Sequence, residues 1–205
     1  MAVIHRATLT PGKLELLAAW LPSRPWCDGV EGLRQLGAYR FDDPAGEVGM
    51  ESFLLQATDG PVLHVPLTYR AAPLDGAEDH LIGATEHSVL GTRWVYDACG
   101  DPVWVTALAI AALTGGSGAE EVVETEHGPE PRPATATVAG SGTTGTDVPV
   151  VYRVTCEDAA ATTLVRSDGL ELTLVRRVGT EAPGETLTGS WAGGGPAVLA
   201  GVRVV

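Results

Sequence analysis

The stretch Leu90-Gly-Thr-Arg-Trp-Val-Tyr-Asp97, followed by the apolar run Val103 to Leu113, decides the fold that the sequence predicts. Between the two segments, Asp101-Pro102 places an N-cap acid before a first-turn proline, which is a typical helix start. Gly115-Gly116 then ends the run. Apolar residues recur along it at helical spacing, so one face of a main internal helix is expected to be buried. That face holds Val105, Leu108, Ala109 and Ala112, with Trp104 beside them.

On the N-terminal side, the sequence predicts a β-hairpin preceded by a shorter helix. Met50 to Ala57 and Val62 to Tyr69 alternate like strands around the turn dipeptide Asp59-Gly60. Leucines at helical spacing over Lys13 to Leu21 predict the helix, with Thr10-Pro11 as its cap and first turn.

On the C-terminal side, strands are expected over 150–156, 162–166 and 170–178, with a tight turn at 167–169 and an apolar strand in the tail. The predicted fold class is therefore α+β, with two antiparallel β subdomains and two main helices.

Residues 128–149 differ in composition from the segments on either side. They hold four of the prolines and a Gly/Ser/Thr run from Gly140 to Gly145, which is typical of a linker. We therefore predict a first subdomain over 1–127, a linker over 128–149 and a β subdomain over 150–205.

The charge of the chain excludes some partners. It carries 26 acidic against 13 basic residues, a net charge of −13, and such a surface repels nucleic-acid phosphates. No apolar stretch is long enough to span a membrane, and the start has no secretory signal pattern. We expect a cytoplasmic protein that binds neither nucleic acid nor membrane.

The residues required by common enzyme classes are not arranged in known signatures. There is no GxxxxGK[ST] loop or GxSxG elbow, and Lys13 is the only lysine. His80 and His87 lie near acidic residues, but without the spacing of a metal motif. Cys27, Cys99 and Cys156 are far apart in sequence and are expected to be reduced thiols. We predict no catalytic, cofactor-binding or metal-binding residues, and leave open whether the two histidines bind a metal.

Five segments, in collinear order, resemble the maltokinase N-terminal cap and the start of the kinase lobe behind it. Trp20-Leu-Pro-Ser-Arg-Pro-Trp26 is similar to the opening of the cap, and the hairpin 52–69 to its curved sheet. Leu90 to Gly115 resembles the family's Tyr-Asp pair and apolar helix. Thr163 to Val178 looks like the first kinase hairpin, which ends in Arg-Arg-Val, and Pro196 to Val202 like a later strand of that lobe.

The resemblance implies a cap-like subdomain, a kinase N-lobe-like β subdomain and a role in α-glucan, maltose, trehalose or glycogen metabolism of the actinobacterial type. It does not imply the activity, because Thr173 stands where the family has its nucleotide-binding lysine. The catalytic lobe of the family also has no counterpart within these 205 residues.

The predicted function is therefore a non-catalytic accessory or binding module, a pseudokinase-like fragment that contacts a partner protein of this metabolism, a glucan or maltose. Candidate contacts are Trp26, His87, Arg93, Trp94 and Asp97, although tryptophans also fill protein cores. The alternative is a subunit of a kinase-related or branching-enzyme-related enzyme in α-glucan or maltose-phosphate metabolism. A third hypothesis is that the protein is a small-molecule sensor.

Overall fold

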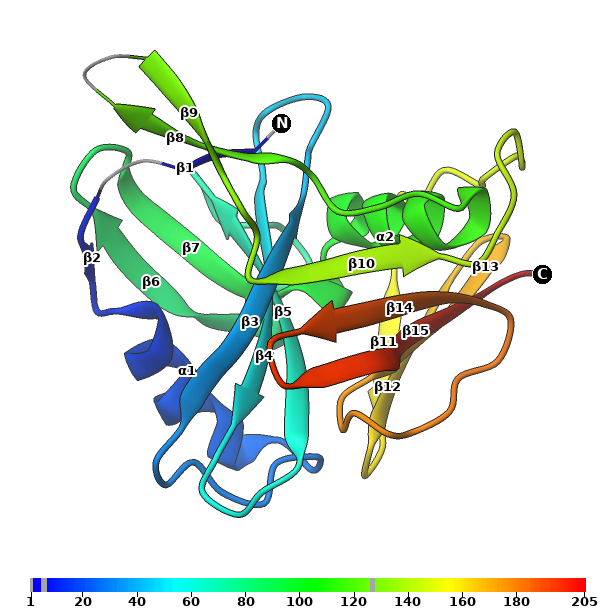
Figure 1. The fold of residues 1–205 in the computed structure, drawn as a ribbon, viewed down its shortest axis with the longest axis horizontal. Helices are drawn as coiled ribbons and strands as arrows, with labels where there is room; N and C mark the ends of the chain where they lie inside the picture. The colour runs from blue at the N-terminus through cyan, green and yellow to red at the C-terminus, as the bar shows by residue number, and fades with distance from the viewer. Residues whose placement is uncertain (1, 5–6, 126–127) are drawn as a thin grey trace.

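Two six-stranded antiparallel sheets form most of the protein, together with a three-stranded sheet and two α-helices (Figure 1). The computed structural model describes residues 2–4, 7–125 and 128–205. The order of the first sheet is β2-β6-β7-β5-β4-β3. Its strands are β2 (Leu9–Thr10), β3 (Arg34–Phe41), β4 (Gly49–Gln56), β5 (Val62–Arg70), β6 (Leu81–His87) and β7 (Gly91–Asp97).

Helix α1 (Lys13–Trp20) covers one face of the first sheet, on the side away from the second sheet (Figure 1). It starts after Gly12, whose N–H donates to Glu15 Oε2 at 3.3 Å. The expected cap was wrong, because Thr10 is paired with Glu86 in the sheet. The buried Leu17 packs against alternate side chains of β4 and β5. Those side chains are Phe53, Leu55, Leu63, Val65 and Leu67.

The predicted hairpin is confirmed as β4 and β5, which pair from Gly49 with Tyr69 to Gln56 with Val62. Because side chains alternate along a strand, Met50 and Leu54 point away from α1. They join a second cluster that includes residues of the other sheet. Strand β3 was not predicted from the sequence, and it adds Tyr39 and Phe41 to that cluster.

Helix α2 (Pro102–Thr114) confirms the predicted internal helix and both of its ends. Asp101 Oδ1 accepts a hydrogen bond from the Val103 N–H at 3.0 Å, and Gly115 ends the helix at a φ of 71°. The face predicted from the spacing is fully buried, as is Trp104. The apolar period therefore identified the contact surface of this helix correctly.

The second sheet has the order β10-β14-β15-β13-β12-β11, and α2 packs against its β10, β14 and β15 side. Its strands are β10 (Ala136–Gly140), β11 (Thr155–Asp158), β12 (Thr162–Ser167), β13 (Leu170–Val175), β14 (Glu185–Trp191) and β15 (Gly194–Val204). The turn between β12 and β13 contains Gly169 at a φ of 83°, where glycine is favoured. The predicted C-terminal hairpin and tail strand are confirmed.

Two expectations for the middle of the chain need correction. Residues 150–154 form no strand. The strand prediction was wrong there because Val151 is buried between two exposed neighbours, an alternation that is also typical of strands. The expected linker contains β9 (Gly128–Arg132) and β10, which pair with β8 (Glu121–Thr125) and β14. Strand β8 also pairs in parallel with β1 (Ala2–Ile4). The boundary expected at residue 127 lies outside the described residues, and the subdomain division stays a prediction.

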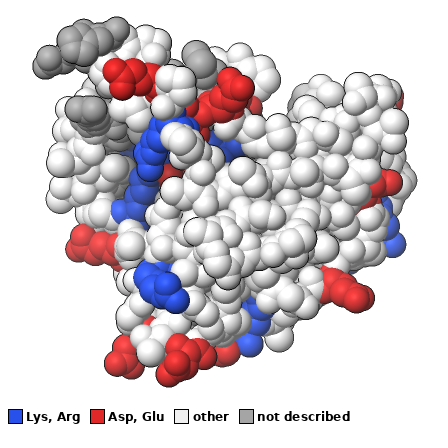
Figure 2. Space-filling model, in the orientation of Figure 1, with Lys and Arg blue, Asp and Glu red and all other residues white. Residues whose placement is uncertain are grey.

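Charged residues avoid the middle of the face shown in Figure 2, where β10 and β14 lie. Strand β10 has no charged residue, and β14 has only Glu185. Within the described residues, no helix is both long and apolar enough to cross a membrane.

Candidate functional site

The two large sheets meet where the chain leaves β13 and crosses β5. The Arg176 carbonyl accepts a hydrogen bond from the His64 N–H, and the Val178 N–H donates to the Val62 carbonyl, both at 2.9 Å. This crossing brings residues from the first hundred positions of the chain against residues beyond 150. A buried arginine–aspartate pair and a cluster of one histidine and two cysteines lie beside this crossing.

Arg176 is fully buried at this junction. Its Nη2 donates to Asp97 Oδ2 at 2.5 Å and its Nε to Thr163 Oγ1 at 2.7 Å, while the guanidinium lies 4.6 Å from the ring centroid of Trp26. Burial is the largest single effect on the pKa of Arg176 and lowers it, but Asp97, Cys99 and Asp158 together outweigh burial, so the pKa is raised. The side chain is a fixed cation inside the protein, held by β7, β12 and the segment before β3.

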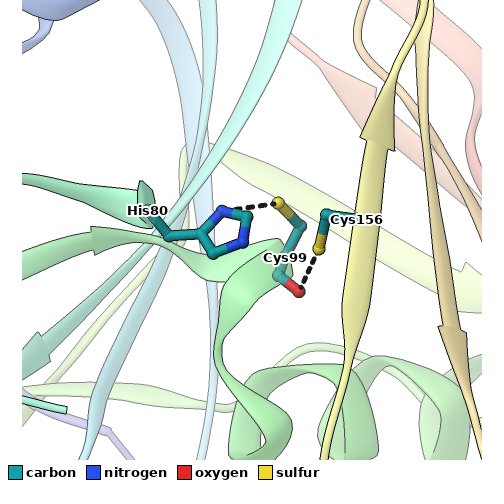
Figure 3. Close-up of side chains that lie close together, drawn as sticks. All are labelled: His80, Cys99 and Cys156. Atoms are coloured by element: carbon teal, nitrogen blue, oxygen red, sulfur yellow. Dashed lines mark hydrogen bonds between the residues drawn. The ribbon is translucent and has the colours of Figure 1, made fainter. Parts of the chain in front are cut away.

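Next to this ion pair, His80, Cys99 and Cys156 point toward one another (Figure 3). They come from the 3₁₀ helices η2 (Glu78–His80) and η3 (Ala98–Gly100) and from β11. Cys99 Sγ lies 3.9 Å from His80 Nδ1, and Cys156 Sγ donates to the Cys99 carbonyl at 3.1 Å. The three possible ligand atoms all lie within 4.8 Å of one another. Imidazole and thiolate are the ligands preferred by zinc.

The cluster is coupled to the buried ion pair. Arg176 Nη2 lies 3.3 Å from Cys99 Sγ. The neighbouring Cys156 thiol, followed by burial, raises the pKa of Cys99 well above its ordinary value. The hydrogen bond with Cys99 raises the pKa of His80. A Cβ on Gly100 would lie 2.3 Å from the His80 ring, so the glycine provides the space that the imidazole occupies.

The five candidate contacts predicted from the sequence do not form one site. Trp26 is fully buried and Asp97 is 3% exposed, so both are enclosed by the fold rather than offered to a ligand. Both side chains contact the Arg176 guanidinium, Asp97 as hydrogen-bond acceptor and Trp26 through its ring, and their role as ligand contacts stays a prediction. His87, Arg93 and Trp94 are half-buried on β6 and β7, and their role as contacts stays a prediction.

His80 and His87 do not share a metal site within the described residues, nor do the acids near them in sequence. His87 Nδ1 instead accepts hydrogen bonds from the N–H groups of Val89 and Leu90 in the β6–β7 turn. Sequence reasoning missed Cys99 and Cys156 as neighbours, because nothing in their spacing suggests contact. Arg176 was noticeable in the sequence, because it belongs to the Arg-Arg-Val segment that follows the β12–β13 hairpin.

The structure also shows the surroundings of Thr173, the residue that the resemblance places at the family's nucleotide lysine. Thr173 lies in β13 beside Gly201 of β15. The loop at Ala182 and Pro183 covers that point, since a Cβ on Gly201 would lie 2.3 Å from the Pro183 carbonyl oxygen. Arg177 is paired with Asp28 and donates to the Trp26 carbonyl at 2.9 Å. Both arginines that follow β13 therefore have acidic partners within the chain, Arg176 in the interior and Arg177 at the surface.

Comparison with known proteins gives one family. Residues 20–101 match the maltokinase N-terminal cap domain, and this range includes all of β3 to β7 and η3. No curated protein matches the chain. The match points, at the level of the family, to maltokinase-related α-glucan metabolism. The resemblance of this chain to the maltokinase N-terminal cap is thus confirmed over residues 20–101.

Proposed function

We propose that this protein is a non-catalytic accessory module of α-glucan metabolism. It uses its first sheet, β2 to β7, which we call the cap-like sheet, to bind a glucan or a partner protein. The observation that carries the proposal is the state of the positively charged groups around β13. Thr173 stands at the place that the resemblance gives to the family's lysine. Arg176 is held in a buried ion pair with Asp97, and the partly exposed Arg177 is paired with Asp28. A polyphosphate needs such cations, so the retained scaffold fits binding better than phosphoryl transfer.

The β6–β7 hairpin is the part of the cap-like sheet proposed to make the contact. Arg93 and Trp94 remain partly accessible on β7, and a half-buried indole can stack on a sugar ring. The turn between the strands exposes Val89 by 57% and Leu90 by 42%. Arg93 and Trp94 are consecutive in the strand and face opposite sides of the sheet, so the indole alone is the proposed sugar contact. The exposed apolar turn is the proposed contact with a partner protein.

Titration calorimetry with a linear maltooligosaccharide tests the glucan reading. Binding to the parent chain and its loss in Trp94→Ala is the expected result. Trp191→Ala is the matched control, because Trp191 is also half-buried but lies in the second sheet. Equal loss in both variants, or no loss in either, would contradict the placement on β7.

Titration with ATP and magnesium tests the non-catalytic part. We expect no binding with a dissociation constant below about 100 µM. The net charge of −13 adds long-range repulsion of an anionic nucleotide. Tight ATP binding by the parent chain, or phosphorylation of maltose, would refute the proposal.

Affinity purification of the tagged chain distinguishes the accessory-module hypothesis from the enzyme-subunit hypothesis. A kinase or a branching enzyme that co-purifies and gains activity from the chain would favour the enzyme-subunit alternative. A glucan-binding chain with no such effect would favour the accessory module.

A further inference from the structure

We propose that His80, Cys99 and Cys156 form a binding site for Zn²⁺ at the junction between η2, η3 and strand β11 of the second sheet. This site is independent of the proposed function, and neither depends on the other. Three soft or borderline ligand atoms, one nitrogen and two sulfurs, already lie within 4.8 Å of one another. Two thiolates and an imidazole form a ligand set that zinc uses with a fourth position left for water.

The geometry of the cluster is prepared before any ion binds. Figure 3 shows the His80 ring edge and the Cys99 and Cys156 sulfurs converging from three different elements. Gly100 leaves room for the imidazole. The Cys156 thiol donates to the Cys99 carbonyl, a hydrogen bond that it gives up when the metal displaces its proton. Cys99 is 1% exposed, whereas His80 and Cys156 are half-buried, so an ion can reach the site from their side.

The charge balance also suits a divalent cation. Binding converts two thiols to thiolates and releases their two protons to solvent, so the two negative charges match the two positive charges of Zn²⁺. The adjacent Asp97 and Arg176 form a neutral pair. The Arg176 guanidinium, 3.3 Å from Cys99 Sγ, offsets only part of the burial that disfavours the thiolate, so the metal itself has to displace the thiol proton. The occupied site would therefore bury no net charge.

Two buried polar atoms next to the cluster support an occupant of this region. Asp97 Oδ1 and Arg176 Nη1 are buried and make no hydrogen bond to any described residue. Such atoms are rare in proteins, and a bound water or ion is one of the groups that satisfy them. A metal-bound water in the open fourth position is the kind of group that these atoms could hold in place.

The alternative explanation for two nearby thiols is a Cys99–Cys156 disulfide. It would leave His80 without a role, although the imidazole is the group that the local backbone makes room for. The test distinguishes the two chemistries. The reduced chain is titrated with Zn²⁺ against a chromophoric chelator and, separately, with Co²⁺, whose thiolate complexes absorb in the near ultraviolet.

The expected result is equimolar Zn²⁺ binding and a cobalt–thiolate absorption band. His80→Ala and Cys156→Ser should each weaken Zn²⁺ binding by more than about tenfold. Cys27→Ser is the matched control, since Cys27 is a half-buried thiol outside the cluster, and it should bind like the parent. Circular dichroism of each variant shows whether it is folded.

Several results would overturn the proposal. One is a folded, reduced chain that binds neither metal. Another is equal loss of binding in Cys27→Ser and Cys156→Ser. A third is a Cys99–Cys156 disulfide, found by mass spectrometry, that forms in air while the reduced protein shows no metal-dependent rise in melting temperature.

Discussion

At the scale of single residues, the Arg176–Asp97 pair is the most consequential interaction in the molecule. It places a charge from the second sheet against a carboxylate at the end of β7, with both side chains almost completely buried. A buried charge without its partner is costly because the interior cannot solvate it. The pair therefore fixes how the segment after β13 sits on the cap-like sheet.

Removing one partner should show this dependence. Arg176→Met is expected to lower the free energy of unfolding by about 3–5 kcal/mol, since Asp97 would stay buried and unpaired. Chemical denaturation measures the change. Arg166→Met serves as control, because its pairs with Glu157 and Glu171 lie at the surface, and its effect should be much smaller. Similar losses in both variants would contradict the structural role of Arg176.

His64 predicts a pH dependence of stability. Burial, and then the nearby Arg176 charge, lower its pKa from 6.5 to about 3. Between these values the unfolded chain binds a proton that the folded chain does not, so stability falls as the pH is lowered from 7. The slope from this one group reaches at most about 1.4 kcal/mol per pH unit.

Unfolding midpoints measured between pH 7 and pH 5 test this slope. His64→Gln should flatten the dependence. The raised pKa of His80 acts with the opposite sign, stabilising the fold at low pH and losing that contribution as pH rises, and it is common to the parent and the variant. An unchanged slope in His64→Gln would show that another group controls it.

At the scale of elements, α2 organises the larger of the two hydrophobic clusters. Its side chains meet Tyr39 and Phe41 of the first sheet as well as Leu187 and Leu199 of the second. Because the helix is apolar over most of its circumference, it can pack against several elements at once. It therefore joins the cap-like part to the rest of the fold.

Leu108→Ala should lower the free energy of unfolding by about 2–5 kcal/mol, because the side chain is fully buried. Ile110→Ala on the same helix is the matched control, since Ile110 is 46% exposed, and a change of about 0.5 kcal/mol is expected. Denaturant titration of both variants checks the pair. A small effect of Leu108→Ala would place α2 at the surface, against the structure.

At the scale of the whole molecule, the cap-like sheet and the second sheet share one core. The cluster around α2 contains residues of β3, β4, β10, β13, β14 and β15. The two parts should therefore unfold together. Scanning calorimetry is expected to give one transition, with a calorimetric enthalpy equal to the van't Hoff enthalpy. Two separate transitions would instead support two independently stable subdomains.

Local patterns in the sequence determined the elements whose signals are complete within a few residues. Helix α2 has a cap, an apolar period and a terminating glycine, and the β4–β5 and β12–β13 hairpins have alternation and a turn. The resemblance to the maltokinase cap could also be recognised from the sequence, because its short segments follow one another in the family's order. These features were predicted correctly.

Only the tertiary structure decided where segments meet. Strand β10 is made of small residues that read as a linker, and it becomes a strand through its pairing with β14. Trp26 and Asp97 both contact Arg176, which lies far from them along the chain, and nothing in their local sequence predicts this contact. Cys99 and Cys156 meet for the same physical reason: contact between distant residues depends on how the sheets pack, and no local pattern encodes it.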